Sequence, residues 1–160
     1  MVLLDVNVLV NAMREDAPGH GVVHAYVESL RTAPEPFGLS DIALSGALRV
    51  LTHPRVFKPP TPAQHARDYV ASLRASPNAV ILAPGNRHWS LFLMLLEQSG
   101  AVGNTVSNAW FAALAMEHGC EWVSDDSDFA RFTGLRWRRP RLGSLPNRIS
   151  ERRRHSNSVG

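Results

Sequence analysis

The sequence predicts an α/β domain with a parallel central sheet. Short, continuous apolar segments typical of buried strands alternate with longer segments whose apolar residues recur at helical spacing. This alternation is the pattern of a parallel sheet covered by helices. The chain has 160 residues, 44% of them hydrophobic and 19% charged, which suits one globular domain with a core of its own.

Each element follows from a local signal. The first strand is expected at MVLLD, an apolar run that ends at Asp5. Further strands are expected at 78–82 and 121–124, with a short last one at 135–137. The pattern predicts helices over about 7–15, 20–31, 42–51, 61–73, 89–100 and 105–118, and a short helix or turn over 126–131.

Composition excludes several classes of protein. No apolar run reaches the roughly 20 residues that cross a bilayer, and the N-terminus lacks the basic region of a signal peptide. Cys120 is the single cysteine, which excludes an internal disulfide and suits a reducing cytosol. No dinucleotide-binding, P-loop or hydrolase-elbow motif occurs. We therefore expect a cytoplasmic protein with no membrane segment.

Positive charge is concentrated at the C-terminus. The net charge is +3, but residues 138–160 contain seven arginines against one glutamate, so the preceding residues are net acidic. The last residues contain too little apolar material to pack. We expect residues 1–140 to form the domain and residues 141–160 to be a basic, disordered tail that can also contact a polyanion.

Acidic residues follow two of the expected strands. Asp5 ends the first strand, and Asp125, Asp126 and Asp128 follow WVS. A single aspartate at such a place is most often a turn former or a helix N-cap. Carboxylates that converge from two parallel strands repel one another unless a cation lies between them. Hard oxygen ligands favour Mg²⁺ or Mn²⁺ over zinc.

A basic cluster, RVLTHPR, contains Arg49, His53 and Arg55. These residues could contact phosphate, and they could equally be a structural cluster at the C-terminus of a helix. Both interpretations stay open at this point.

Three segments together resemble the PIN domain, and more narrowly the VapC-type toxin ribonucleases of bacterial toxin–antitoxin pairs. They are LLDVNVLVNA, GNTVSNAWFAALAMEHG and WVSDDSDFARFTGLRW, and LSGALRVLTHPRVF resembles one subgroup of those toxins. The resemblance covers about residues 1–137. It implies a three-layer α/β/α fold with a short, mainly parallel sheet, and a Mg²⁺-dependent (or Mn²⁺-dependent) endoribonuclease that cuts structured RNA such as tRNA or rRNA. It also implies a homodimer that a cognate antitoxin inhibits.

The resemblance assigns residues by position. Asp5 matches the first metal-binding acid, with Asn7 as its polar companion. Asp126 matches the acid after the last core strand, and Asp128 follows it closely. Asn7, Arg49 and Arg55 are the residues we expect to contact the substrate.

Two positions depart from the family pattern. Relatives usually have Asp-Ala where this chain has Asn108-Ala109, and an amide lacks the charge that strengthens metal binding. Many relatives carry a glutamate at the position of Gly46, which leaves Asp41 as the nearby acid. The predicted metal ligands are thus Asp5, Asn108 and Asp126, and the predicted catalytic residues are these three with Asp128.

The identity of residue 108 leaves alternatives open. A natural amide and an introduced replacement of an acid both fit, and the otherwise intact motifs favour the second. We expect this form to be a weakened or inactive nuclease, and the rival function is a catalytically dead PIN module that binds antitoxin or RNA. A phosphohydrolase is a third alternative, but residues 5–9 lack the second Asp and the Thr of a DxDxT motif.

Overall fold

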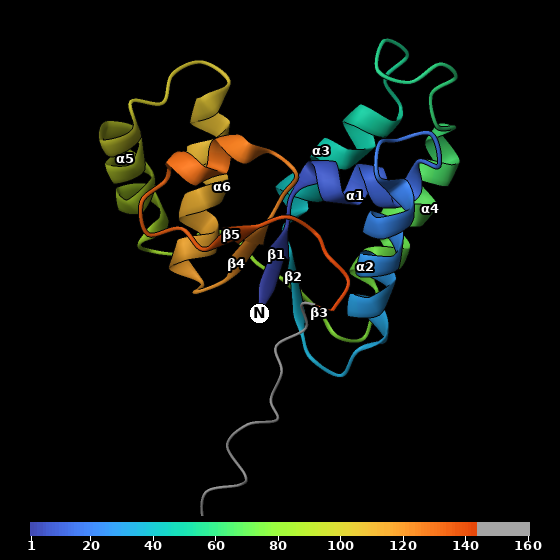
Figure 1. Cartoon of the computed structure of the whole chain (residues 1–160), viewed down its shortest axis with the longest axis horizontal. Coiled ribbons are helices and arrows are strands. Elements are labelled where there is room, and N and C mark those ends of the chain that lie inside the picture. Colours follow the sequence, from blue (N-terminus) through green and yellow to red (C-terminus); the bar gives the residue numbers. More distant parts are fainter. Residues whose placement is uncertain (144–160) are drawn as a thin grey trace, which may run out of the picture.

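The computed structural model of the protein describes residues 1–143. The expected basic tail lies almost wholly in residues 144–160, outside the described part. The sheet has five strands in the order β3-β2-β1-β4-β5, and all four strand pairs are parallel (Figure 1). The strands are β1 Val2–Leu4, β2 Phe37–Leu39, β3 Ala79–Ile81, β4 Glu121–Val123 and β5 Trp137–Arg138.

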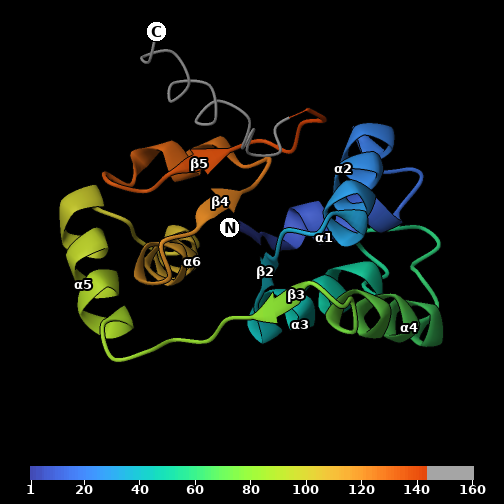
Figure 2. The same cartoon turned by 90° about the horizontal axis from the view of Figure 1, so that it is seen from below.

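Helices cover both faces of this sheet. One set, α1 to α4, lies on one side, whereas α5, α6 and the short 3₁₀ helix η1 lie on the other (Figures 1 and 2). The bounds are α1 Val6–Met13, α2 His20–Thr32, α3 Asp41–Leu51, α4 Ala63–Arg74, α5 His88–Ser99, α6 Thr105–Glu117 and η1 Ser127–Arg131. The three-layer α/β/α fold is therefore confirmed.

The core is divided by the sheet because neighbouring strand residues face opposite ways. Leu3 packs with α5 and α6, whereas the adjacent Leu4 packs with α1 to α4. Both side chains are fully buried, so β1 is the central strand of the molecule in packing as well as in order. This central position places the residue after β1, Asp5, at the middle of the carboxyl edge of the sheet.

The structure contains one strand, β2, that the sequence pattern does not predict. Phe37-Gly38-Leu39 is short, has glycine at its centre and follows Pro34 and Pro36, so it carries no strand signal. Tertiary packing explains the glycine, because a β-carbon on Gly38 would lie 3.0 Å from the Val2 carbonyl oxygen. The other expected elements are present, with ends that differ by a few residues.

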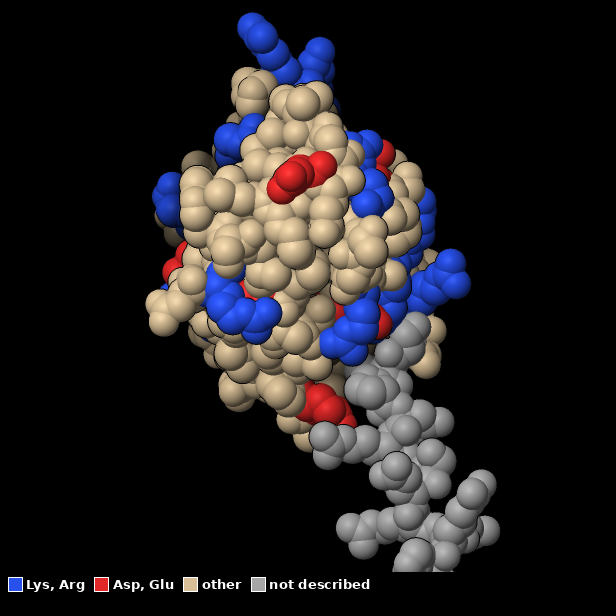
Figure 3. All heavy atoms as spheres, turned by 90° about the vertical axis from the view of Figure 1, so that its left-hand side faces the viewer, with Lys and Arg blue, Asp and Glu red and all other residues tan. Residues whose placement is uncertain are grey.

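Helix α5 exposes two large apolar side chains on its outer face, which also carries Glu97. It packs on α6 through Phe92 and Leu95, but Trp89 and Leu93 on its other side are 64% and 47% exposed. Glu97 is its one charged residue, and the face over α5 is correspondingly poor in charge (Figure 3). Within residues 1–143, no helix is long and apolar enough to span a membrane.

Candidate active site

The predicted acids meet at the carboxyl edge of β1 and β4. These strands are parallel neighbours with Leu4 opposite Val123, so the residues that follow them, Asp5 and Ser124 to Asp126, leave the sheet side by side. Asp5 is 6% exposed and caps α1, with its Oδ1 accepting from the Val6 N–H at 2.6 Å. Asp5 therefore has both features at once: it caps a helix, and it lies near a second acid.

Ser124 joins the two acidic segments. Its fully buried Oγ donates to Asp5 Oδ2 at 2.6 Å and accepts from the Asp126 N–H at 3.0 Å. It also accepts from Asn7 Nδ2 at 3.0 Å. The sequence pattern does not single out this serine, and its one signal is its place between a strand and an acid. The hydroxyl sets the spacing between Asp5 and Asp126.

Asn7 uses both ends of its amide to hold the same elements together. Its Nδ2 donates to Asp5 Oδ2 at 3.1 Å, and its Oδ1 accepts from the Asp125 N–H at 3.1 Å. The start of α1 is thereby tied to the end of β4. This placement makes Asn7 a residue that orients the acids.

Asn108 lies against Asp126. Its Nδ2, in the first turn of α6, donates to Asp126 Oδ2 at 3.3 Å. The other oxygen of Asp126 accepts from the Asp128 N–H at 2.9 Å, and the Asp128 side chain is exposed at the start of η1. The structure therefore brings Asp5, Asn108 and Asp126 to one place, with Asp128 at its rim.

The site disfavours uncompensated negative charge. The pKa of Asp5 is raised from 3.8 to about 6, mainly by burial and in smaller part by the nearby Asp126 carboxylate. Hydrogen bonds from Ser124, Val6 and Asn7 act in the opposite direction but do not cancel the effect of burial. A cation beside the two carboxylates would remove this penalty.

The structure supplies no further acid from α3. A β-carbon on Gly46 would lie 2.9 Å from Val6 Cγ2, so α3 packs too closely on α1 for a side chain at this position. Asp41 is exposed and accepts from Arg74 Nε at 2.9 Å and Nη2 at 3.3 Å, an ion pair between α3 and α4. Across residues 1–143, no three Asp, Glu, His or Cys side chains are grouped to hold a metal ion.

The oxygen atoms at the site are nevertheless of the kind that a hard divalent cation prefers. Asp5 and Asp126 offer carboxylate oxygens, and Asn108, already within hydrogen-bonding distance of Asp126, offers an amide oxygen. Mg²⁺ and Mn²⁺ prefer such ligands, although affinity falls as ligand charge is lost. The residues that are present thus fit a metal with two charged ligands and one neutral ligand.

A groove of about 460 Å³ begins beside these residues. It lies between α3 and the α5–α6 pair, and Val6, Gly46, Arg49, Ser107 and Trp110 are among its lining residues. Val6 and Ser107 are the immediate neighbours of Asp5 and Asn108 in the chain, so the groove leads away from the acidic site. Arg49 lies along this groove, whereas Arg55 lies beyond it on the loop between α3 and α4.

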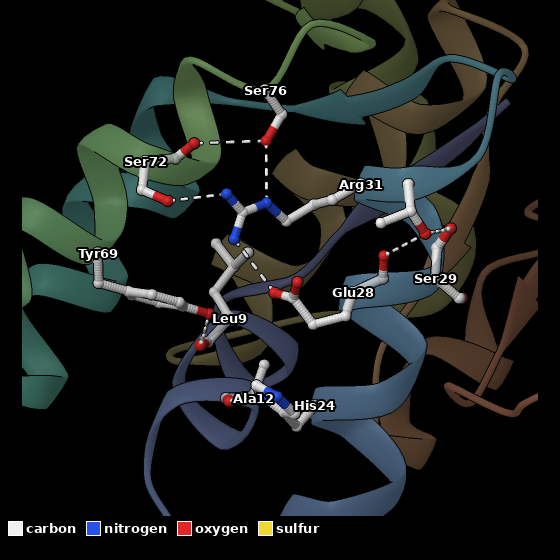
Figure 4. Close-up of polar contacts among 10 residues, drawn as sticks. Leu9, Ala12, His24, Glu28, Ser29, Arg31, Tyr69, Ser72 and Ser76 are labelled. Atoms are coloured by element: carbon white, nitrogen blue, oxygen red, sulfur yellow. Dashed lines mark hydrogen bonds and ion pairs between the residues drawn. The ribbon is translucent and has the colours of Figure 1, made fainter.

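Helix α1, whose N-cap is Asp5, is braced from outside the site. The Tyr69 hydroxyl of α4 donates to the Leu9 carbonyl at 2.7 Å, and His24 of α2 bonds the Ala12 carbonyl at 3.0 Å (Figure 4). Arg31 then links α2 to Ser72 and Ser76 at the end of α4. These contacts fix the helix that carries Asp5 and Asn7 without using any residue of the site.

The fold and the strand-end acids define the class of this protein. The family model of the PIN domain matches residues 2–135, and the chain belongs to this family. Among its curated relatives, Ribonuclease VapC43 of Mycobacterium tuberculosis is 45% identical over 140 residues, which cover 88% of this chain and 95% of that protein. Ribonuclease VapC25 of the same species is 38% identical, and the match covers 88% of this chain and 99% of that one.

Solved structures share the fold at low identity. VapBC2 from Rickettsia felis, bound to a DNA fragment from its promoter, matches with a TM-score of 0.64 at 16% identity, covering 87% of this chain and 98% of that one. VapC20 of M. tuberculosis, described as a toxin that cleaves the sarcin–ricin loop, matches with a TM-score of 0.60 at 15% identity, covering 85% and 99%. The PIN domain and VapC resemblance stated from the sequence is confirmed.

Proposed function

We propose that this chain is a Mg²⁺-dependent endoribonuclease of the VapC type, the toxin of a type II toxin–antitoxin pair, and that it cleaves structured RNA such as tRNA or rRNA in the cytoplasm. The observation that carries the proposal is the convergence of Asp5, Asp126 and residue 108 at the carboxyl edge of the sheet. Relatives at 45% and 38% identity bear the name ribonuclease, which supports the reaction class.

The residues divide the work by position. Asp5 and Asp126 would hold Mg²⁺ or Mn²⁺, with Asn108 as a neutral third ligand. When bound, the metal would polarise the scissile phosphate and lower the pKa of an attacking water. Ser124 and Asn7 keep the two carboxylates at a fixed spacing through their hydrogen bonds. Arg49, exposed along the groove, is placed to offset the charge of the RNA backbone.

Asn108 weakens this site in two ways. Its amide contributes no negative charge toward a cation, and its Nδ2 already occupies an oxygen of Asp126. The same contact favours the rival function, a PIN module that binds antitoxin or RNA without cutting. The nuclease should gain activity when an acid is placed at position 108, whereas the binding module should not.

The test is cleavage of total RNA by the Asn108→Asp variant, followed by sequencing of the new RNA ends. We expect Mg²⁺-dependent cuts at defined positions, at least about a hundredfold faster than with Asn108, since one charged ligand is restored. The matched control is the Asn108→Asp/Asp5→Asn double variant, which keeps the new acid but loses a ligand. Equal cleavage by the original chain and the Asn108→Asp variant would remove the metal role of position 108, and no cut by either would favour the binding module.

We propose a cognate antitoxin as the protein partner. Structures with the same fold were solved as VapBC pairs from Rickettsia felis and nontypeable Haemophilus influenzae. The groove between α3 and α6 offers an apolar lining that includes Ile42, Val106 and Trp110, with Arg49 beside it. A partner segment with apolar side chains and an acid would match these features.

A homodimer is the second assembly we propose. Trp89 and Leu93 form an exposed apolar patch on the side of α5 that faces away from α6, with Glu97 one turn beyond Leu93. Exposed apolar patches often mark contacts between proteins. A second copy of this chain would cover that face.

A further inference from the structure

We propose that residues 52–60, the loop between α3 and α4, form an RNA-contacting arm that Arg14 holds in place through Phe57. The arm would bind the RNA backbone at a distance from the cut, mainly through Arg55 and Lys58. This inference rests on the proposed function, because it extends the substrate path beyond the groove at the acidic site.

Two helices connect the acidic site to the arm. Helix α1 begins after Asp5 and ends at the C-cap Arg14, and α3 begins after Ser40 at the end of β2 and ends at Leu51. With 11 residues, α3 is roughly 16 Å long at about 1.5 Å per residue. Figure 1 shows the loop that joins α3 to α4 rising above these helices, on the side toward which β1 leads. The arm therefore stands at a fixed distance from the acids and on the same side of the molecule.

Arg14 contacts the arm at Phe57 and the adjacent Thr61, and Asp16 holds the Arg14 guanidinium in place. Its guanidinium carbon lies 4.2 Å from the centre of the Phe57 ring, a cation–π geometry. Its Nη1 donates to Thr61 Oγ1 at 3.3 Å, and its Nε and Nη2 pair with both oxygens of Asp16 at 2.8 and 2.6 Å. Because Arg14 is itself the C-cap of α1, these contacts join the arm to the helix that begins at Asp5.

The base of the arm is also ordered by its own backbone. The Thr61 N–H donates to the Leu51 carbonyl at 2.8 Å, which closes the loop, and the N–H groups of Val56 and Phe57 both reach the His53 carbonyl. This turn leaves Val56 53% exposed while Phe57 packs against the core. A turn that buries one residue and exposes its neighbours presents Arg55 and Lys58 to solvent in a set geometry.

The charges form a path from the site. Arg49, Arg55 and Lys58 are exposed, and none of them makes an ion pair within residues 1–143. The Asp16 carboxylate pairs with Arg14, and Glu15 lies beside them without an ion pair in the described part of the chain. Arg49 lies along the groove beside the acidic site, and Arg55 and Lys58 lie beyond it on the arm. Exposed cations so placed suit an RNA backbone, and a pre-ordered arm loses little entropy on binding.

The experiment measures binding of a fluorescein-labelled RNA stem–loop by fluorescence anisotropy over a range of salt concentrations. It uses the chain with Asn108, in EDTA, so that cleavage does not interfere. The Arg55→Ala/Lys58→Ala variant removes the charges, and Phe57→Ala removes the ring but keeps the charges. Phe57→Tyr keeps an aromatic ring over Arg14, and Arg87→Ala removes an exposed cation at the far start of α5 as the matched control. Circular dichroism checks that each variant is folded.

Removing the two charges should weaken binding about tenfold or more and reduce the slope of log affinity against log salt by about 1.5, since each phosphate contact contributes roughly 0.7 to 0.9. Phe57→Ala should weaken binding severalfold with the salt slope nearly unchanged, and Phe57→Tyr should restore it. A charge-removal variant that binds like the original chain, or that loses no more than Arg87→Ala, would overturn the arm. The proposal would also be overturned if the arm variants bind RNA normally but no longer bind the antitoxin. The arm would then be a contact for that protein.

The arm and the nuclease can fail separately. The arm alone is wrong if Asn108→Asp cuts RNA with Mg²⁺ while the arm variants bind RNA normally. The nuclease is wrong if Asn108→Asp cuts nothing, and the anisotropy result then still decides whether the arm binds RNA.

Discussion

Among single residues, hydrogen bonds hold the site together, with Asp5 and Ser124 buried and Asn7, Asn108 and Asp126 half-buried. Ser124 and Asn7 contact Asp5 directly, and Ser124 also accepts from the backbone of Asp126. Asn108 then approaches Asp126 from α6. Residue 108 thus lies at the place predicted for a third metal ligand, but its side chain carries no charge.

The raised pKa of Asp5 makes stability depend on pH. Because this pKa is about 6 in the folded protein and ordinarily 3.8, the folded state holds the proton more tightly than the unfolded state does. The contribution of Asp5 to stability is therefore full below about pH 4 and is lost as the pH rises through 6. Asp5→Asn does not titrate, so its stability relative to the original chain should improve by about 2 kcal/mol between about pH 4 and about pH 7.5.

Urea denaturation of both proteins at the two pH values, in EDTA, measures this difference. Comparing the change with pH removes the constant effect of altered hydrogen bonds in the variant. A relative stability that stays the same at both pH values would mean that Asp5 ionises normally.

Ser124→Ala tests the bridge between the acids. The variant leaves Asp5 Oδ2 and the Asp126 N–H without their shared buried partner, so we expect a loss of about 1–3 kcal/mol. Ser127→Ala, an exposed serine three residues away, is the control and should change little. Thermal and urea unfolding of the two variants check this, and equal losses would show that the bridge contributes nothing of its own.

At the scale of elements, the close approach of α3 to α1 shapes the site. Val6 fills the space beside Gly46, and Val6 lies between Asp5 and Asn7 in the chain. A side chain at position 46 would therefore push on the residues that orient the acids. The close contact with Val6 thus agrees with the presence of glycine at position 46, where many relatives carry a glutamate.

A double-mutant cycle tests this packing. Ala is favoured over Gly inside a helix by about 1 kcal/mol, but in the original chain its β-carbon would collide with the stiff Val6 side chain. We expect Gly46→Ala to be neutral or destabilising alone, and to stabilise by about 1 kcal/mol in a Val6→Ala background. Urea unfolding of the four proteins gives the coupling, and additive effects would contradict the collision.

The elements also show how much the sequence predicts. The helices and the strands β1, β3 and β4 follow from apolar patterns that are local in the sequence, although β3 proves to be an edge strand with Val80 38% exposed. β2 escapes prediction because Gly38 is chosen for its approach to the Val2 carbonyl, a contact between distant residues. For the same reason the convergence of Asp5 and Asp126 is predictable from strand ends, whereas the bridging role of Ser124 and the close contact of Gly46 with Val6 are not.

In the whole molecule, the helices on the two sides of the sheet differ in their polar contacts and in the apolar surface they expose. The α1–α4 side is braced by polar contacts such as Tyr69 to Leu9 and Arg31 to Ser76. The α5 side instead exposes Trp89 and Leu93 over a face with little charge (Figure 3). This difference suits the outer face of α5 for assembly.

Leu93→Glu tests the proposed dimer. A charge in the centre of a buried apolar contact is costly, so the variant should be monomeric where the original chain is dimeric. Val22→Glu, an exposed apolar residue on α2, is the matched control and should leave the assembly unchanged. Light scattering after size exclusion measures the mass, and a dimer that survives Leu93→Glu would remove α5 from the interface.

We propose above all that Asp5, Asp126 and residue 108 form one metal site that lacks a charge. The most direct measurement is Mn²⁺ binding, followed by electron paramagnetic resonance of the free ion, for the original chain, Asn108→Asp and Asn108→Asp/Asp126→Asn. We predict weak binding by the original chain, at least about tenfold tighter binding by the Asn108→Asp variant, and loss of that gain when Asp126 is also changed. Equal affinity in all three proteins would show that residue 108 and Asp126 do not bind the metal together.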